Sequence, residues 1–161
     1  MGVKKAECQL ALYVAGHTSI NTINHLSETC KDCFKGCESA EKLQLHRTKC
    51  GQIIKNILAT HFNEDLVQDI GDSPFGLLID ESTDISVTKF LGLIIIYYST
   101  KQSKILTSFL SMPELATCTA EDIVATIKTV FQNKKLLLKK LMGIGTDNAS
   151  VMVGVNNSVF K

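Results

Sequence analysis

The sequence contains no tryptophan, only two prolines and no hydrophobic run long enough to cross a membrane. Its most apolar stretch covers residues 90–98, whereas a membrane-spanning helix needs about 20 apolar residues. Lys4, Lys5 and Glu7 interrupt the start of the chain, which therefore lacks the apolar core of a secretory signal. These absences predict a soluble, intracellular protein without a membrane segment.

Net charge is also nearly lacking, because 17 basic residues are matched by 16 acidic ones and leave a formal charge of +1. Neutralisation of phosphates by Lys and Arg supplies much of the affinity of nucleic-acid-binding proteins. The composition therefore argues against tight DNA binding by the whole surface of this chain alone. Hydrophobic residues make up 45% of the sequence, which is enough for a packed core and argues against disorder.

Hydrophobic periodicity divides the chain into two regions. In the first region the pattern is helical, and apolar residues from Cys50 to Ile70 recur every three or four positions, with a break expected near Asn63. Glycine and proline in residues 71–74 end this helix. Short apolar runs typical of strands follow. We therefore predict a helical N-terminal region at 1–72 and an α/β domain at 75–161.

The second region is expected to form a mixed sheet. Only residues 100–103 separate its second and third strands, so these strands should pair as an antiparallel hairpin. Thr119, with Asp122 three residues later, is typical of a helix start. That helix allows the fourth strand to run parallel to an earlier one. The predicted order is strand 75–79, strand 89–99, strand 104–112, helix 119–133, strand 141–145 and helix 149–161.

Two aspartates follow predicted strands directly. Asp80 comes after Ile79, and Asp147 comes after Thr146. If these strands are neighbours, both carboxylates emerge at the same edge of the sheet, where they suit Mg²⁺ and phosphoryl-transfer chemistry. Aspartate is also common in turns and helix caps, so Asp147 alternatively caps the helix after it. The acids Glu81 and Asp84 are further candidates, although their position favours solvated turn residues.

The two acidic segments resemble a known family. The segment FGLLIDESTD at 75–84 is similar to the first catalytic segment of hAT-superfamily transposases and their domesticated, zinc-finger-bearing relatives. The segment GIGTDNASVMVG at 143–154 resembles the second, and the similarity extends over about residues 7 to 161. The resemblance implies a partial ribonuclease H-like α/β fold of order βββαβα, preceded by a helical N-terminal extension. It further implies a nuclear protein that cleaves and transfers DNA strands, with Asp80 and Asp147 binding Mg²⁺ or Mn²⁺.

The family's third catalytic acid, a glutamate, lies well beyond the second segment, so we expect a chain truncated after the second aspartate motif. With two of three acids, this chain alone is not expected to be a competent transposase. The alternative is a non-catalytic interaction module that binds protein or nucleic acid, or associates with itself, through its helical half and the edge of an incomplete sheet.

A zinc-finger spacing is present in the helical region. Cys30 and Cys33 are separated by two residues, and His46 and Cys50 by three, as in four-ligand zinc sites. However, Cys37 occupies the usual aromatic position of such a finger, and the family resemblance aligns this stretch with a helical linker. We therefore expect reduced thiols and a solvated His46 rather than zinc.

Overall fold

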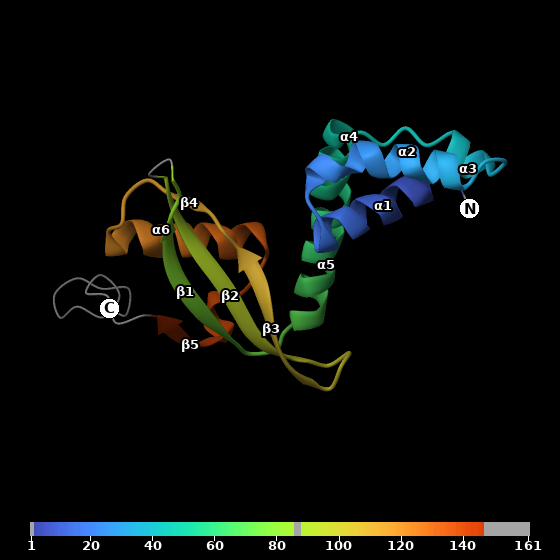
Figure 1. Cartoon of the computed structure of the whole chain (residues 1–161). Coiled ribbons are helices and arrows are strands. Elements are labelled where there is room, and N and C mark those ends of the chain that lie inside the picture. The colour runs from blue at the N-terminus through green and yellow to red at the C-terminus, as the bar shows by residue number, and fades with distance from the viewer. Residues whose placement is uncertain (1, 86–87, 147–161) are drawn as a thin grey trace. The chain divides into compact units, whose positions relative to one another are not determined.

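The computed structural model describes residues 2–85 and 88–146 (Figure 1). The chain divides into two compact units, Met1–Glu64 and Asp65–Lys161. We call these the helical unit and the sheet unit. The division falls within one helix, because Leu66 and Ile70 near its end pack in the core of the sheet unit. The domain boundary that hydrophobic periodicity predicts, between residues 72 and 75, stays a prediction.

The helical unit is built from short helices around a core of its own. Its fully or largely buried side chains include Ala11, Val14 and Ile23 from the first helices. The predicted break near Asn63 is absent, because α5 is a regular helix through this residue. The irregularity lies earlier, where the helix widens into a π-helical turn at 54–58. The elements are α1 (Val3–His17), a 3-10 turn (Ile20–Thr22), α2 (Ile23–Cys33), α3 (Glu38–Glu41), α4 (Arg47–Ile53), the π turn (Ile54–Leu58) and α5 (Ala59–Ile70).

A buried acid links three segments of the helical unit. Glu7 of α1 is almost fully buried, and one of its carboxylate oxygens accepts hydrogen bonds from the Lys49 Nζ at 2.6 Å and the Gln44 backbone N at 3.1 Å. Buried charge is tolerated only when it is paired and hydrogen-bonded. The Glu7 contacts therefore fix α1 against α4 and the loop before it.

The sheet unit contains the predicted mixed sheet. Its strands lie in the order β3-β2-β1-β5, with the short β4 paired to β2. The hairpin predicted around residues 100–103 is confirmed, since β2 and β3 are antiparallel. Strand β4 was not predicted, because two residues give no periodicity. The elements are β1 (Phe75–Thr83), β2 (Lys89–Ser99), β3 (Lys104–Ser111), β4 (Glu114–Leu115), α6 (Ala120–Asn133), a 3-10 turn (Leu138–Lys140) and β5 (Leu141–Thr146).

Helix α6 covers one face of the sheet, which we call the inner face (Figure 1). Successive side chains of a strand point to opposite faces, so Phe75, Leu77 and Ile79 of β1 all lie on the inner face and are buried. The predicted start of α6 is confirmed, because Thr119 Oγ1 accepts a hydrogen bond from the backbone N of Asp122 at 3.3 Å. The predicted helix at 149–161 lies outside the described residues.

A polar network attaches the end of α5 to the sheet. Asp69 is buried and accepts hydrogen bonds from the Tyr97 hydroxyl at 3.0 Å and the Ser99 hydroxyl at 2.9 Å. Burial raises the pKa of Asp69, but the hydrogen bonds from Ser99 and Tyr97 and the charge of Lys101 outweigh it, so the pKa is lowered. Burial and the neighbouring Asp69 raise the pKa of Tyr97 to about 12. The network therefore holds an ionised acid against a neutral phenol.

None of the described helices combines the length and apolar content needed to cross a membrane.

Candidate metal site at the carboxyl edge of the sheet

The two strands that precede the predicted acids are parallel neighbours. Strand β1 pairs with β5 in a register that places Leu77 beside Ile144, Leu78 beside Gly145 and Ile79 beside Thr146. The sequence pattern allowed the fourth predicted strand to run parallel to an earlier one, and the structure pairs it with the first. Ile79 and Thr146 are the residues immediately before Asp80 and Asp147. Because the two strands are parallel, both run toward the same edge of the sheet. Strand β1 continues to Thr83, so Asp80 lies within β1, just past the last residue paired with β5, and does not follow the strand as the sequence pattern predicted.

Asp80 is exposed on the face opposite α6. Its side chain lies on the same side of β1 as Leu78, because Ile79 between them points into the core. Its Cα partner on β2 is Gly92, where an added Cβ would lie 3.3 Å from the Asp80 carbonyl oxygen. The absence of a side chain at Gly92 leaves the strand next to Asp80 bare. No hydrogen bond or ion pair within the described part of the chain occupies the Asp80 carboxylate.

Asp147 lies outside the described residues, so its predicted place beside Asp80 stays a prediction. Within residues 2–85 and 88–146, no three side chains of histidine, cysteine, aspartate or glutamate gather as a metal site. Of the two predicted acids, the described residues therefore include Asp80, and a metal site at this edge would have few ligands from the described part of the chain. Mg²⁺ accepts such a site, because it keeps several waters and binds substrate phosphates.

The other two candidate acids lie differently. Glu81 follows Asp80 and so points to the opposite face of β1, where it pairs across from Leu91. A carboxylate oxygen of Asp84 accepts a hydrogen bond from the backbone N of Ile85 at 2.6 Å, and its own N–H donates to the Thr88 carbonyl at 2.9 Å. These contacts are those of a turn residue. The structure therefore places Glu81 on the face of β1 opposite Asp80.

The residues of the zinc-finger spacing are spread through the helical unit. Cys50 is completely buried in its core, and burial raises the pKa of this thiol, which disfavours the thiolate that zinc requires. Cys30 is half-buried, whereas Cys33 and His46 are exposed. All six cysteines are free thiols. Cys50 thus packs as a small apolar side chain, which its spacing from His46 did not reveal.

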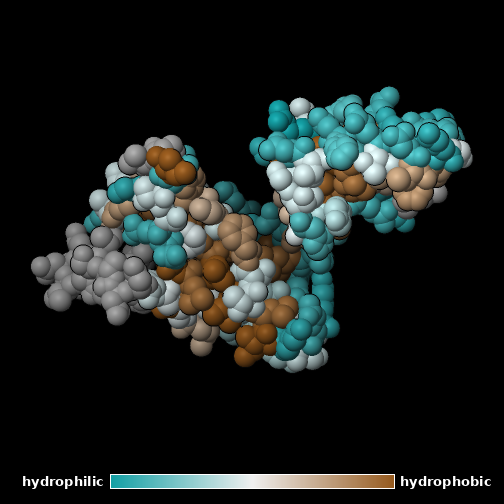
Figure 2. All heavy atoms as spheres, viewed as in Figure 1, coloured by the Kyte–Doolittle hydropathy of each residue, from teal (hydrophilic) through white to brown (hydrophobic). Residues whose placement is uncertain are grey.

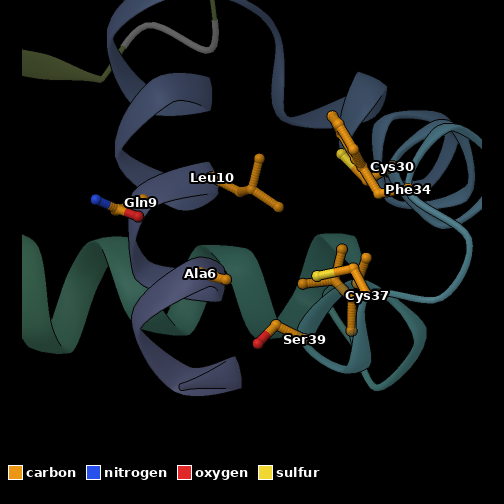
Figure 3. Close-up of a pocket in the computed structure, with 9 residues that line it drawn as sticks. Ala6, Gln9, Leu10, Cys30, Phe34, Cys37 and Ser39 are labelled. Carbon is orange, nitrogen blue, oxygen red and sulfur yellow. The ribbon is translucent and has the colours of Figure 1, made fainter. Parts of the chain in front are cut away.

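An apolar pocket of about 230 Å³ lies in the helical unit and was not predicted from the sequence. In Figure 3, Leu10 of α1 lies across from Cys30 and Phe34, and the Cys37 side chain lines another side. A pocket formed by residues far apart in the chain leaves no signal in hydrophobic periodicity. Most of its lining side chains are apolar, so the pocket suits an apolar group rather than a metal or a phosphate. The lining residues are Ala6, Gln9, Leu10, Cys30, Phe34, Cys37, Ser39, Ala40 and Leu43.

The chain matches the sequence model of a protein family. The sequence model of the family DUF4371, described as "ZMYM1/FAM200, RNase-like domain", matches residues 19–157. The match covers most of the chain, including the greater part of the helical unit and both aspartate segments. It agrees with the mixed sheet and with the ribonuclease-like fold expected from the sequence.

Proposed function

Because the chain belongs to the ZMYM1/FAM200 RNase-like domain family, a domesticated transposase-derived group, we propose that it descends from an hAT-type transposase. The ancestral reaction is metal-dependent cleavage and transfer of DNA strands in the nucleus. Asp80 and Asp147 are the two acids of that site which this chain carries. By themselves, we expect these residues to bind a metal without turning over DNA.

The parallel register of β1 and β5 is the observation that carries this proposal. It aligns Ile79 with Thr146, so the chain positions just before the two acids are adjacent. Carboxylates at the ends of adjacent parallel strands converge on one edge, as Mg²⁺ or Mn²⁺ bound to phosphate oxygens requires. The Asp80 carboxylate is exposed and has no partner among the described residues, and Gly92 beside it carries no side chain, which supports the same interpretation.

In such a site the carboxylates have a specific task. Asp80 and Asp147 would hold the metal, which would supply positive charge to stabilise the charge that develops on the phosphate oxygens. Two metals about 4 Å apart are needed to stabilise both the attacking and the leaving oxygen.

Metal titration followed by thermal unfolding tests the site. We expect Mg²⁺ or Mn²⁺ to stabilise the wild-type chain, by about 2.7 kcal/mol at one hundred times the dissociation constant. Asp80→Asn and Asp147→Asn should each abolish this shift. Asp72→Asn is the matched control, because Asp72 is an exposed acid just before the opposite end of β1. Equal metal shifts in all four proteins would remove the proposed site.

A DNA strand-transfer assay with either metal tests the lack of turnover. We expect no product from the isolated chain. Product that depends on metal and disappears in Asp80→Ala would show that the chain is a competent enzyme and would overturn this part of the proposal.

The second candidate function is a non-catalytic interaction module. It is favoured by the sheet edge along β5, which pairs with no strand other than β1 among the described residues. An unpaired edge strand is a template for pairing with another chain. Association without any response to metal, detected by light scattering and by binding to DNA or protein, would favour this candidate over the metal site.

A further inference from the structure

Acidic and basic side chains of the sheet unit gather at opposite ends of its sheet. The end where β1 finishes holds acids of β1, of the residues after it and of the first turn of α6, together with Lys89. The other end, where β1 and β5 begin, holds lysines from the start of β3, the end of α6 and the turn before β5. We call these lysines the basic edge: Lys104, Lys134, Lys135, Lys139 and Lys140.

The strand register brings these segments to one edge of the sheet. One row of paired residues crosses the sheet there and consists of Leu106, Tyr97, Phe75 and Leu141. Lys104 lies two residues before this row on β3, and Lys140 lies one residue before it at the start of β5. Neighbouring strands are about 4.8 Å apart, so the three steps from β3 to β5 span about 14 Å. Figure 1 shows the β2–β3 hairpin and the start of β5 at this end of the sheet, and Figure 2 shows hydrophilic surface at the hairpin.

The end of α6 holds its lysines in a fixed segment. The backbone N of Leu136 donates to the Phe131 carbonyl at 2.9 Å, and the backbone N of Lys135 donates to the Gln132 carbonyl at 3.1 Å. This pair of bonds is a common way to end a helix, and an apolar contact usually accompanies it. Leu136 and Phe131 are both buried in the core of the sheet unit. The lysines on either side of Leu136 therefore extend from an anchored segment.

Lys135 occupies a position that ordinarily belongs to glycine. Its φ is 57°, in the left-handed region, where a side chain is unfavourable and glycine is preferred. After α2 and α5 the chain has Gly36 and Gly71 at positive φ, with values of 84° and 51°. At the end of α6 it has a lysine instead. Backbone strain of this kind is typical of residues retained for function.

The acids nearby leave most of the basic edge without an ion pair. Lys101 of the hairpin is excluded from the edge because its amine pairs with Asp65 at 3.0 Å. Asp69 is buried and occupied by two hydroxyl groups. Within residues 2–85 and 88–146, no ion pair joins an acid to the other lysines in question, which are Lys104, Lys135, Lys139 and Lys140. Their positive charge is therefore available to an external anion.

The spread of the lysines matches a chain of phosphates. One strand of a nucleic-acid duplex carries one charge per about 3.4 Å of helix axis, so about 14 Å spans four phosphates. A membrane surface instead requires a long amphipathic helix, whereas residues 134–140 comprise a helix end and the three-residue turn Leu138–Lys140.

The face of the sheet opposite α6, which we call the outer face, has a different chemistry. Among its described residues it offers aliphatic and aromatic side chains but no amine to neutralise phosphates. The binding surface for a phosphate chain is therefore the edge and not the face. The outer face consists of Leu78, Ile94, Ile96, Tyr98, Ile105 and Phe109.

We propose that the basic edge binds the phosphodiester backbone of nucleic acid without reading its sequence. Five residues of β1 separate Phe75, in the row beside the basic edge, from Asp80, which is a distance of about 17 Å. The surface is therefore distinct from the candidate metal site. Binding there requires no metal, so it stands or fails independently of the function proposed for Asp80.

Fluorescence anisotropy with a labelled DNA duplex of about 20 base pairs tests the surface in the full chain. Measured in a chelator and from about 50 to 200 mM salt, the logarithm of the association constant should fall with the logarithm of salt with a slope of about −4. The double variant Lys139→Gln, Lys140→Gln should bind several-fold more weakly, and its slope should be shallower by about two. The matched control is Lys4→Gln, Lys5→Gln, which removes an exposed lysine pair from the helical unit and should bind as wild type.

Two results would overturn the proposal. One is equal affinity and slope in the two double variants. The other is the absence of duplex binding by wild type at the lowest salt concentration. Binding to vesicles that contain phosphatidylserine, without binding to the duplex, would assign the lysines to a membrane surface instead.

Substitution of Lys135 separates a binding role from a structural one. Lys135→Gly relieves the positive φ, so its melting temperature should equal or exceed that of wild type, while its salt slope becomes shallower by about one. Lys135→Ala loses the same charge but keeps the strain, so it should melt at a lower temperature than Lys135→Gly with the same loss of binding. Wild-type DNA affinity in both variants would show that the strained lysine does not contact the backbone.

Discussion

The helical unit and the sheet unit bury their apolar residues in different ways. In the helical unit, short amphipathic helices turn their apolar stripes toward one shared core, in which Ala11, Ile23 and Cys50 are completely buried. In the sheet unit, α6 closes the inner face, and no described residue of the unit closes the outer one. A helix has a single stripe to bury, whereas a sheet has two faces. The comparison shows why a few neighbouring helices complete one core but a sheet needs elements on both sides.

The largest expected effect is on stability, and it distinguishes substitutions on the inner face of the sheet from those on the outer face. Leu93→Ala removes a fully buried side chain of the inner face, and we expect it to lower the free energy of unfolding by about 3 kcal/mol. Ile94→Ala, the adjacent position on the outer face, should cost about 1 kcal/mol. Urea denaturation followed by circular dichroism measures both. Equal costs would mean that the outer face is packed as tightly as the inner one.

The next effect concerns the polar network of the sheet unit. Tyr97→Phe removes a hydrogen bond to the ionised Asp69 and should cost about 2 kcal/mol. The pKa of folded Asp69 lies below its ordinary value of 3.8, so its contribution is present above that pH and is lost as the pH falls through the lowered pKa. Melting temperatures of wild type and Asp69→Asn between pH 2 and pH 7 should therefore converge in acid. A constant difference across this range would contradict the lowered pKa.

The same network predicts a limit at high pH. The pKa of folded Tyr97 is raised to about 12, above the ordinary value of 10.0. Stability from the neutral phenol is therefore fully present below pH 10 and is lost as the pH rises through 12. Ultraviolet titration of the three tyrosines should show one that ionises late, and Tyr97→Phe should remove it. Three tyrosines with ordinary pKa values in wild type would disprove this.

A smaller effect is expected from the buried acid of the helical unit. Glu7→Gln retains an acceptor for the Gln44 N–H but loses the charge opposite Lys49, and should cost about 1 kcal/mol. The exposed pair of Lys42 and Glu38 provides the control, because Lys42→Ala should change stability by less than about 0.5 kcal/mol. Thermal unfolding measures both. If the two variants were equally stable, burial would not strengthen the Glu7 pair.

The smallest effect is on reactivity rather than stability. Burial raises the pKa of the Cys50 thiol, and the thiolate is the form that reacts with alkylating agents. We expect iodoacetamide to modify the exposed Cys33 and Cys37 well before Cys50 in the native protein, as measured by peptide mass spectrometry. In urea all three should react at similar rates. Early modification of Cys50 in the native protein would show that the core of the helical unit opens readily.

Much of the sheet unit could be predicted from local patterns. The apolar runs at 75–79 and 89–99 predict strands because β-branched and aromatic side chains fit a pleated surface, and the structure confirms both. The helix after Thr119 is confirmed because a cap hydrogen bond is local and has a sequence signature. Periodicity was less informative within the helical region, where the π turn at 54–58 retains an apolar spacing close to that of an α-helix.

The candidate sites also differ in how well local sequence patterns predicted their geometry. The zinc spacing of Cys30, Cys33, His46 and Cys50 satisfies a sequence rule, yet Cys50 packs in the core and the exposed His46 lies at the start of α4. Spacing fixes separation along the chain but not direction in space. Alternation was more informative for Asp80, because side chains along a strand point to opposite faces, which places Asp80 on the face opposite the core residue Ile79.

The sequence by itself determined the long strands, the helix after Thr119 and the alternation of side chains along β1. Only the tertiary structure decided that β5 lies parallel to β1 with Ile79 beside Thr146, that Cys50 is core, and that α6 covers just one face of the sheet. The physical reason is the separation along the chain over which each kind of interaction acts. Propensity, capping and alternation act over a few neighbouring residues, whereas strand pairing and packing join residues more than sixty positions apart, such as Leu77 and Ile144.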